Sequence, residues 1–551
     1  MKSTKLTAGI YGIQDIANFM FPVYVHDHSF VLFSKGKIIN YLQLERFTKI
    51  KYDNTLYSVI DPLLKSIGLT DADSADVIFT DNEIGRAFIS KSGKIRFEAP
   101  LLPVLAAGME KGNSFWFGQR KDAYVLNHEL SHIYSCIPFY GTFKENSLLV
   151  HSDGGASKSN FSAWHFVNGK LQLLEYHYDL KYLSNIFNAN ALVFSIIGAS
   201  RKNQNSLPGK FMGFAAYGSY REELEDWLVT NNYFADIWSK KSVFFRKIKI
   251  DWGVELKSFD QKNPFIQDVA ATLHYIFERE MLKKFTSLQQ ATGARFLYYT
   301  GGSALNIKLN AKLVNSGLFE DIFIPPCTGD CGLSIGAASY MEIWKGNVIK
   351  IHSPYLNNFG IENCQVNYNS VDIEKTATLL MENNVIGICN GYGEAGPRAL
   401  GNRSIISLAD SKKLAKKVNE FHKGREWYRP LAPVMLEKNV KYFTGLKEIH
   451  PLSRFMLIEF RIQNDRIPEL AGAVHIDKTA RIQTLFRKTD NPFLYDLLML
   501  LDKKYNVKAL INTSFNNNGF PMVHTENDAM KTAGSMKLNA VVINGKLNRL
   551  C

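Results

Sequence analysis

At 551 residues the chain is too long for one ordinary domain, since domains usually hold about 100–200 residues. Hydrophobic residues make up 46% of it and aromatic residues 13%, which argues against a disordered or fibrous protein. Its net charge of +13 predicts an anionic partner, either a nucleic acid or a small phosphorylated compound.

The six cysteines form no Cys-x-x-Cys pair and no dense framework, which favours a reducing compartment. The N-terminal segment MKSTKLTAGIYGIQD lacks the continuous apolar core of a signal peptide. No stretch approaches the roughly 20 apolar residues that span a bilayer. The sequence therefore predicts a soluble, cytoplasmic protein with no membrane partner.

Two segments of the N-terminal half share one pattern, His26–Glu45 and His151–Glu175. Each places an Asp at the end of an apolar stretch, followed by an aromatic-rich strand, a Gly-Lys turn and a second apolar strand. Apolar runs on both sides of a glycine turn predict β-hairpins. The repeat predicts a duplicated α/β unit with one Asp at the mouth of each half, although two unrelated hairpins would also look alike.

A pair of histidines, His128 and His132, is spaced four residues apart on a predicted helix. This spacing puts both imidazoles on one face, where they can share a metal ion, but such a pair can also be incidental. Asp330, in a glycine-flanked turn, is the candidate third ligand. Two imidazoles and a carboxylate suit Fe(II) or another divalent ion. Cys327 and Cys331 are alternative ligands that we expect to be packing residues.

A glycine turn, TGGSALN, follows a predicted helix (Asn263–Gly293) and a predicted strand (Arg295–Tyr299). Glycines between a strand and a helix let backbone N–H groups approach a phosphate, and the helix dipole adds to this. A plain structural turn is the alternative. With the hairpin repeat, the turn suggests an actin-like ATPase architecture that holds nucleotide between its halves. The predicted nucleotide contacts are Asp153, Gly154, Gly301, Gly302 and Asn306.

A domain boundary is predicted near residues 350–370, where the sequence is polar, rich in turns and without helical periodicity. We expect an N-terminal domain at 1–358 and a second α/β domain at 359–551. The second domain begins with a predicted helix (Ile373–Met381) and a strand (Val385–Cys389).

Basic residues of the second domain lie beside Gly, Pro and apolar residues, on turns that follow strands. Guanidinium groups bind phosphate with two parallel hydrogen bonds and keep their charge. The arrangement favours a pocket for a small phosphate compound over a nucleic-acid groove. Buried ion pairs with Glu394 and Glu426 are the structural alternative. The residues are Arg398, Arg403, Lys423, Arg425, Arg429 and Arg481.

Ser514 ends a predicted strand, within LINTSFNNNGFP. No Gly-x-Ser-x-Gly elbow surrounds it, so the hydroxyl is expected to bind substrate or to support the turn rather than to act as a nucleophile.

These motifs together resemble the carbamoyltransferases of the nodulation-factor, cephamycin and tobramycin type, over almost the whole chain. The N-terminal motifs are HDHS, LERFTKIKYD, the His128–His132 pair, SDGG, GKFMGFAAYG, TGGSALNIKLN and GDCGLSIGAA. The C-terminal motifs are GPRALGNRSI, REWYRPLAP, HIDKTARIQT and INTSFNNNGFP. The resemblance implies an N-terminal duplicated actin-like ATPase (ASKHA) domain and a C-terminal YrdC-like α/β domain.

The resemblance also implies an activity, an ATP-dependent O-carbamoyl transfer through carbamoyl-adenylate to an acceptor hydroxyl of a sugar or natural product. It implies a divalent metal, with Fe(II) favoured, at the transfer site and Mg²⁺ with ATP. By resemblance, His128, His132 and Asp330 are the metal ligands. These three residues and Arg429 are the catalytic residues. Lys423, Arg429 and Arg481 bind carbamoyl phosphate, with Arg398, Arg403 and Ser514 beside them. Asp153, Gly301, Gly302 and Asn306 face the adenylate.

Three motifs depart from the usual family pattern. Glu129 stands where a His commonly follows the first metal-binding His. The usual Asp-Gly-Thr reads Asp477-Lys478-Thr479, and the usual Phe-Arg-Pro-Phe reads Tyr428-Arg429-Pro430-Leu431. Glu129 could alter metal preference, and Lys478 could alter phosphate affinity.

Other functions stay open. A protein or tRNA could be the acceptor, although nucleic acid is not the expected partner, and a catalytically silent nucleotide-binding protein is a third reading. The expected partners are ATP, carbamoyl phosphate and a small-molecule hydroxyl acceptor. A homodimer is compatible with the sequence.

Overall fold

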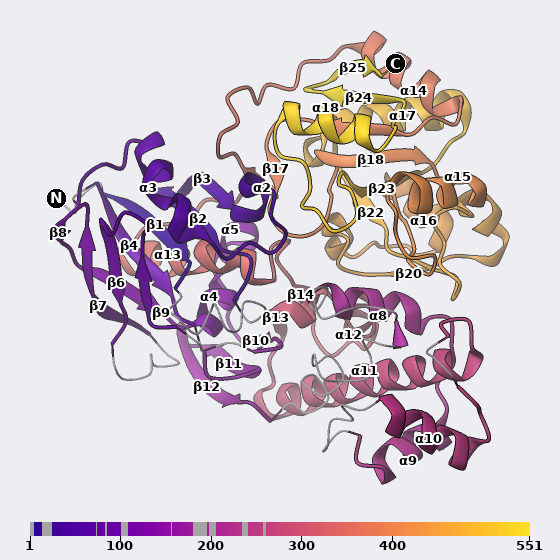
Figure 1. Ribbon diagram of the computed structural model, residues 1–551, viewed down its shortest axis with the longest axis horizontal. Helices are drawn as coiled ribbons and strands as arrows, with labels where there is room; N and C mark the ends of the chain where they lie inside the picture. The colour runs from indigo at the N-terminus through magenta and orange to yellow at the C-terminus, as the bar shows by residue number, and fades with distance from the viewer. Residues whose placement is uncertain are drawn as a thin grey trace.

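The computed structural model describes residues 5–13, 25–72, 74–82, 85–100, 108–155, 157–179, 196–197, 205–233, 241–256 and 260–550 (Figure 1). Cys551, one of the six cysteines, lies outside these residues. The five cysteines that the structure describes form no disulfide.

The first sheet has nine strands in the order β3-β2-β1-β4-β9-β7-β6-β5, with β8 paired to β7. Strand β1 is antiparallel to β2 and parallel to β4, and β4 is parallel to β9. The strands are β1 (Leu6–Tyr11), β2 (Ser29–Ser34), β3 (Lys37–Gln43), β4 (Ala75–Thr80), β5 (Ala87–Ile89), β6 (Ile95–Glu98), β7 (Met109–Trp116), β8 (Gln119–Arg120) and β9 (Ala123–Leu126).

The second sheet repeats the first part of this pattern in the order β12-β11-β10-β13-β14. Strand β10 is antiparallel to β11 and parallel to β13, and β13 is parallel to β14. Both predicted hairpins, β2–β3 and β11–β12, are therefore confirmed, each within the same strand order. The strands are β10 (Ser147–Ser152), β11 (Phe161–Val167), β12 (Lys170–His177), β13 (Phe296–Thr300) and β14 (Asp321–Phe323).

Two helices join the sheets, α4 (His128–Tyr134) and α13 (Leu333–Trp344). They pack against each other, with α13 on β1, β2 and β4 and with α4 on β10 and β13. A Cβ at Gly336 would lie 1.6 Å from the carbonyl oxygen of Ser131 in α4. Only glycine permits this approach, since any side chain would push α13 away from α4.

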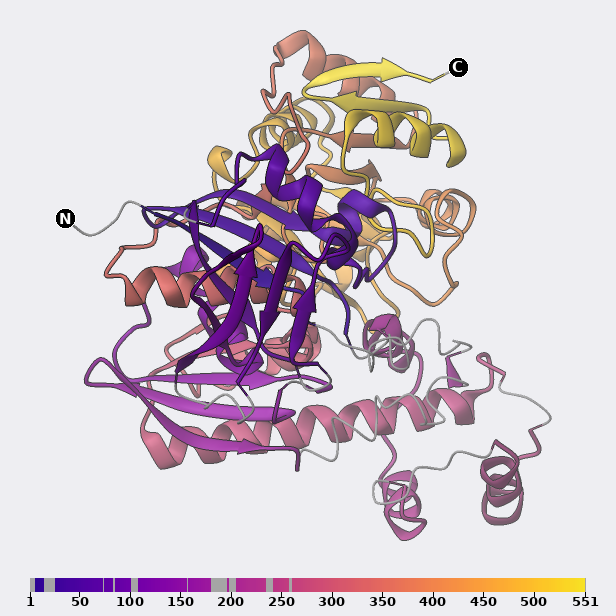
Figure 2. The same ribbon diagram turned by 60° about the vertical axis from the view of Figure 1, so that its left-hand side comes forward.

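Further helices surround the sheets. Helix α11 contacts β10, α8, α9 and α12, and Figure 2 shows it running along the second sheet. The helices of the N-terminal half are α2 (Leu44–Thr48), α3 (Leu56–Ser66), α5 (Ile137–Tyr140), α8 (Leu207–Ala215), α9 (Glu222–Thr230), α10 (Lys241–Trp252), α11 (Pro264–Thr292) and α12 (Ile307–Asn315).

The C-terminal part has a seven-stranded sheet in the order β22-β19-β23-β18-β16-β24-β25. Its strands are β16 (Ile386–Cys389), β18 (Arg403–Leu408), β19 (Ala432–Leu436), β22 (Gln483–Leu485), β23 (Leu510–Ser514), β24 (Ala540–Ile543) and β25 (Lys546–Arg549). Two short pairs flank it, β15 (Tyr355–Asn357) with β17 (Gly393–Glu394) and β20 (Phe460–Arg461) with β21 (Thr479–Ala480). The helices are α14 (Ser370–Met381), α15 (Lys412–Lys416), α16 (Glu437–Thr444), α17 (Pro492–Tyr505) and α18 (Glu526–Ser535).

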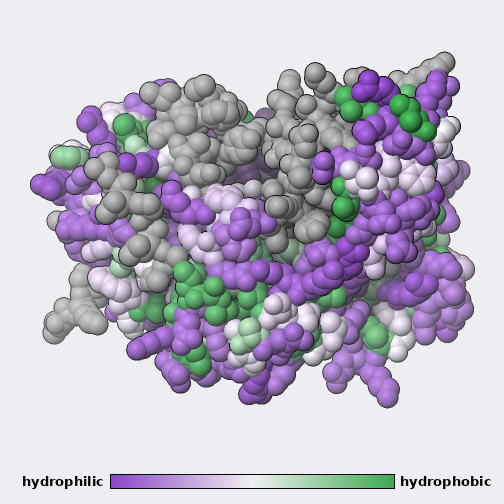
Figure 3. Space-filling view, turned by 90° about the horizontal axis from the view of Figure 1, so that it is seen from below, coloured by the Kyte–Doolittle hydropathy of each residue, from purple (hydrophilic) through white to green (hydrophobic). Residues whose placement is uncertain are grey.

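One hydrophobic core connects the second sheet with the C-terminal sheet, because it includes Leu148 and Phe211 together with Ile405 and Leu510. Among the described helices, none combines the length and the hydropathy that crossing a membrane requires. Among the residues that carry a hydropathy colour in Figure 3, most are hydrophilic, with hydrophobic groups between them. The three large sheets and the helices around them confirm the mixed α/β class that the sequence predicts.

Candidate functional site

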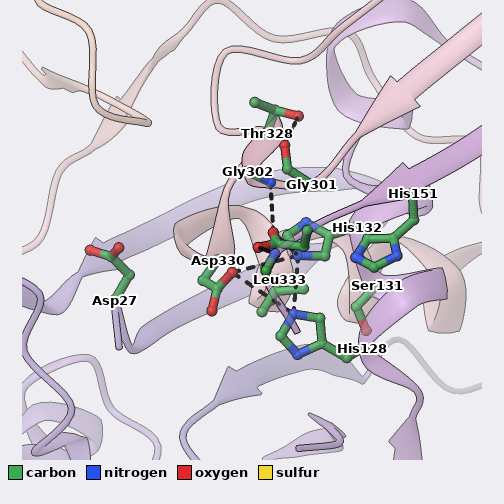
Figure 4. A network of polar contacts seen from close by, with 12 residues as sticks. Asp27, His128, Ser131, His132, His151, Gly301, Gly302, Thr328, Asp330 and Leu333 are labelled. Atoms are coloured by element: carbon green, nitrogen blue, oxygen red, sulfur yellow. Dashed lines mark hydrogen bonds and ion pairs between the residues drawn. The ribbon is translucent and has the colours of Figure 1, made fainter. Parts of the chain in front are cut away.

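Helix α4 presents His128 and His132 on one face, as the spacing predicts. Asn127 caps the N-terminus of this helix, because its side chain accepts the N–H of Leu130. The Nε2 atoms of the two histidines lie 3.1 Å apart, and both side chains are buried. The pair is therefore directed toward one point rather than into solvent (Figure 4).

Asp330 completes this group from the turn that precedes α13. Its Oδ1 lies 3.8 Å from Nε2 of His128 and 3.6 Å from Nε2 of His132. Tyr11 in β1 donates its hydroxyl to Oδ2 at 3.0 Å. The structure thus brings together the three residues that the sequence analysis grouped as metal ligands.

The chemistry of these donors fits a divalent ion. Two imidazole nitrogens, each about 2.1 Å from an ion and at right angles, would lie about 3.0 Å apart. Burial lowers the pKa of His128 to about 3, so this imidazole stays neutral at neutral pH. Burial opposes ionisation of Asp330, but the surrounding histidines hold its pKa below the ordinary value. Neutral imidazole and ionised carboxylate are the states that bind metal.

Other residues at the cluster were missed as site residues in the sequence analysis. His26 lies 3.0 Å from Asp27 and 3.9 Å from Asp330. Although burial opposes its protonation, Asp330 and Asp27 raise the pKa of His26 to about 9. The His151 ring stacks on His132 with centroids 5.1 Å apart. The HDHS and HSDGG segments were visible as a repeat, which was the available signal for Asp27, His26 and His151.

The predicted glycine turn lies beside this cluster. Asp153, at the end of β10, accepts the N–H of Gly302 at 2.6 Å and the N–H of Gly154 at 2.5 Å. The Oδ2 of Asp153 lies 3.7 Å from Nε2 of His132. Gly301 has a φ of +92°, and a Cβ there would lie 2.2 Å from the Ser152 carbonyl oxygen. The predicted nucleotide residues Asp153, Gly154, Gly301 and Gly302 therefore meet next to the group of His128, His132 and Asp330.

Asn306 has a structural role instead of a free side chain. Its Oδ1 caps α12 by accepting the N–H groups of Lys308 and Leu309. Its amide nitrogen lies 3.1 Å from Nε2 of His274, whose Nδ1 lies 2.5 Å from Glu278. Both ends of the amide are engaged, so a nucleotide contact would have to displace one of these bonds.

A group of arginines, Arg398, Arg425, Arg429 and Arg481, gathers in the C-terminal half. Burial and the guanidinium groups of the other three lower the pKa of Arg481, and burial and Arg429 lower that of Arg398 to about 10. The Nε of Arg481 is buried and has no hydrogen-bond partner among the described residues. Clustered cations of this kind are unfavourable unless an anion joins them.

Of the two predicted acidic partners, Glu426 pairs with Arg429 of this group, whereas Glu394 bonds to backbone N–H groups. Glu394 accepts the backbone N–H groups of Leu400, Asn402 and Arg403, and so it anchors the glycine loop. Glu426 lies 3.4 Å from Nη1 of Arg429 and also binds Lys210 of α8 at 2.7 Å.

Lys423 and Ser514 meet at the end of β23. The Lys423 ammonium donates to the carbonyl oxygen of Ser514 and to Asn516. Arg425 donates to the Ser514 hydroxyl at 2.9 Å. Burial and Arg425 lower the pKa of Lys423. Arg425, which the sequence analysis left out of the grip on carbamoyl phosphate, belongs to this group by position.

Arg403 does not join the group. It is buried and donates to the carbonyl oxygens of Asn390, Gly391 and His524 at 2.7–3.0 Å. These bonds occupy its guanidinium donors, so the arginine holds the loop together. Its predicted substrate contact is not supported by this geometry, because a substrate would have to replace backbone bonds.

The structure shows the local setting of two of the three departures from the family pattern, Glu129 and Lys478. Glu129 faces away from the ligand group and accepts the N–H groups of Lys158 and Ser159 at 2.9 and 3.0 Å. It fastens the segment after Asp153 to α4, which does not support the expected effect on metal preference. Lys478 has a φ of +66°, a conformation that glycine adopts without strain.

Two family models match the chain. The model of the carbamoyltransferase N-terminus matches residues 20–339, and that of the carbamoyltransferase C-terminus matches residues 377–549. Nodulation protein NolO of Bradyrhizobium diazoefficiens is 36% identical over 299 residues, which are 51% of this chain and 54% of that protein. Nodulation protein NolNO of Sinorhizobium fredii is 28% identical over 585 residues, covering 98% and 82%. The chain thus spans about half the length of the first relative.

Solved structures show only a distant likeness. Full-length HypF in its phosphate- and nucleotide-bound form has a TM-score of 0.33 and 12% identity, covering 62% of this chain and 56% of that chain. A ROK family glucokinase from Streptomyces griseus has a TM-score of 0.27 and 10% identity, covering 60% and 98%. Scores this low do not establish a shared fold.

Proposed function

This chain belongs to the carbamoyltransferase family, and on that premise we propose that it is an ATP-dependent O-carbamoyltransferase. Carbamoyl phosphate would lose its phosphate to water, and the carbamate oxygen would attack the α-phosphorus of ATP. This forms carbamoyl-adenylate and releases pyrophosphate. An acceptor hydroxyl would then attack the carbonyl carbon, so that AMP leaves and the hydroxyl proton goes to solvent or a base.

The observation that carries this proposal is the group of cations formed by the buried Lys423 and the partly buried Arg398, Arg425 and Arg481. A pocket that holds several fixed positive charges suits small phosphorylated substrates better than a neutral ligand. Arg429, which is half-buried beside Glu426, can reach the same anion.

We assign the two steps to two domains, 1–358 and 359–551. The repeated strand order of the first two sheets supports an actin-like ATPase (ASKHA) architecture for the N-terminal domain. The C-terminal domain, with the arginine group, would be the YrdC-like adenylation domain. Mg²⁺ would accompany ATP there.

His128, His132 and Asp330 would hold a divalent ion, for which Fe(II) is the favoured candidate because of the two-His, one-carboxylate donor set. Such an ion would supply Lewis acidity to a carbonyl oxygen. The protein itself fixes the ligands, because Tyr11 orients Asp330 and the packing of α13 on α4 holds the carboxylate near the imidazoles. Asp153 keeps the Gly301-Gly302 turn at the same place.

The acceptor is proposed to be a hydroxyl of a sugar or other natural product, in the cytoplasm. A tRNA acceptor would be favoured by the net charge of +13, but it predicts binding that weakens steeply with salt. A protein acceptor and a catalytically silent nucleotide-binding role are two further candidate functions.

The first experiment is mass spectrometry of the metal-loaded protein after incubation with ATP, Mg²⁺ and carbamoyl phosphate, without acceptor. Carbamoyl-adenylate and pyrophosphate are expected from the wild type. Arg481→Met should form neither, because it removes a partly buried cation while keeping an apolar side chain of similar length. Phosphate should stabilise the wild type against heat more than this variant. A folded wild-type protein that forms no adenylate would favour the silent nucleotide-binding role.

A further inference from the structure

The segment Gly302–Asn310 lies between the two candidate sites and contacts both. On the metal side, Gly302 donates its N–H to Asp153 at 2.6 Å. On the anion side, Arg398 of the arginine group donates to the carbonyl oxygen of Leu305 at 3.2 Å. The same short segment therefore forms a wall of each site.

Lys308 provides the charged contact across this wall. It occupies the first turn of α12, and its Nζ lies 2.6 Å from Oδ2 of Asp477 and 3.3 Å from Oε1 of Glu459. Its side chain is 18% exposed, and those of Asp477 and Glu459 are 23% and 14% exposed. Lys308 thus forms ion pairs with two carboxylates from the C-terminal half of the chain.

Asp477 in turn organises the chain that leads to Arg481. Its Oδ1 accepts the Thr479 hydroxyl at 2.7 Å and the Thr479 N–H at 3.1 Å. Lys478 between them is held at a φ of +66°, a conformation that is strained for a residue with a Cβ. His475 Nδ1 lies 3.8 Å from the same carboxylate oxygen. The turn therefore depends on Asp477 staying in place.

We infer that Lys308 is a positioning residue that fixes the segment 477–481, which bears Arg481, against the turn bearing Gly301 and Gly302. This role rests on the proposed function, because Lys308 would keep the distance between the proposed adenylation site and the proposed metal site constant. Neither a phosphate contact nor a metal contact is assigned to Lys308 itself.

Loss of the lysine charge would leave Asp477 and Glu459 facing each other without this cation. Two carboxylates at short range repel each other, and partial burial strengthens the repulsion. The turn could relieve it by moving away from α12. The arginine group would then lose its fixed distance from Asp153, although each site would keep its own residues.

The test compares Lys308→Met with Lys284→Met. Methionine removes the charge and keeps much of the apolar stem. Lys284 is a matched control because it pairs with Glu175 at 2.5 Å and is also partly buried, but both partners lie in the N-terminal half. Two quantities are measured on folded protein, carbamoyl-phosphate-dependent ATP–pyrophosphate exchange and the radiolabelled adenylate that remains bound after rapid desalting.

Lys308→Met should keep exchange within about twofold of the wild type but retain at least fivefold less adenylate, while Lys284→Met should match the wild type in both. A purely structural defect would lower exchange and retention together, and that result would overturn the inference, as would unchanged retention. Asp477→Asn should reproduce the Lys308→Met result.

A second readout is independent of activity. Hydrogen–deuterium exchange without substrates should show faster exchange at 477–481 in Lys308→Met than in the wild type or Lys284→Met. Unchanged exchange there would refute the positioning role. If the wild type forms no adenylate, the proposed function fails, and this measurement still decides whether Lys308 holds the turn.

Discussion

Burial and neighbouring charges set the protonation states of His128 and Asp330 in the candidate metal site. His128 is kept neutral by burial, while Asp330 is kept ionised by the histidines around it. The same burial leaves Nδ1 of His128 and Nδ1 of His132 without hydrogen-bond partners among the described residues. A bound ion would use the opposite nitrogens, Nε2, which already face each other.

His128→Ala should weaken divalent-metal binding at least tenfold, because it removes one of two imidazole ligands. Pyrophosphate exchange at the arginine group should stay within about twofold of the wild type. Metal content is measured by mass spectrometry after anaerobic loading with Fe(II) or Co(II). Glu129→Gln is the control on the same helix, since Glu129 bonds to Lys158 and Ser159 rather than to the ligand group. Full metal occupancy in His128→Ala would remove His128 from the ligand set.

At the scale of elements, a buried network joins α11 to the start of α12. Glu278 of α11 lies 2.5 Å from both His274 and Lys312, and His274 reaches the cap residue Asn306. Although burial opposes ionisation, His274 and Lys312 lower the pKa of Glu278 to about 2. The folded protein therefore binds this proton more weakly than the unfolded chain does.

The ionisation of Glu278 should make the free energy of unfolding depend on pH. Because its folded pKa lies below the unfolded value of about 4.5, its contribution is complete above that pH and is lost as the pH falls toward 2. Glu278→Gln should lower the free energy of unfolding by about 2–3 kcal/mol at pH 7 and by much less near pH 2. Urea unfolding across this range measures the difference. Equal effects at both ends would contradict the ionised state of Glu278.

Local patterns predicted the elements well and the roles of single polar residues less well. The spacing of His128 and His132 and the Gly turn after β13 are local signals, and they led to the ligand pair and the turn. Asn306 was expected to contact nucleotide, but Asn is also a favoured helix cap, and the sequence does not separate these uses.

Long-range packing could not be read from the sequence. Tyr11 contacts Asp330 across 319 residues, and no local period announces such a pair. Arg403 begins β18, and Arg481 lies between β21 and β22, so both arginines stand beside short strands. Arg403 donates to backbone carbonyls, whereas the Nε of Arg481 has no hydrogen-bond partner among the described residues. This difference depends on how loops that are distant in sequence pack around each arginine.

At the scale of the whole molecule, three lysines of the N-terminal half pair with acids of the C-terminal half. Lys49 pairs with Asp528, Lys210 with Glu426, and Lys308 with Asp477. These three contacts have the same direction of charge, whereas His450 of the C-terminal half lies 3.6 Å from Asp321 of the N-terminal half. Salt should weaken the three lysine contacts between the halves, although burial of Lys210 limits the screening.

Raising NaCl from 0.1 to 1 M should lower the free energy of the first urea transition by about 1–2 kcal/mol in the wild type. The effect should shrink in a variant with Lys49→Met, Lys210→Met and Lys308→Met. The control carries Lys249→Met, Lys283→Met and Lys438→Met, whose ion pairs each stay within one half. An equal salt effect in all three proteins would show that these contacts do not hold the halves together.

The contact of Gly336 with the Ser131 carbonyl has a consequence for how loss of function would arise in this chain. A single added methyl group at position 336 meets an oxygen at 1.6 Å and forces α13 to move. Asp330, at the head of that helix, would be carried away from two histidines that are themselves unchanged. A genetic screen would then recover an inactivating lesion at a residue with no functional group, and a survey restricted to charged and polar positions would never find it.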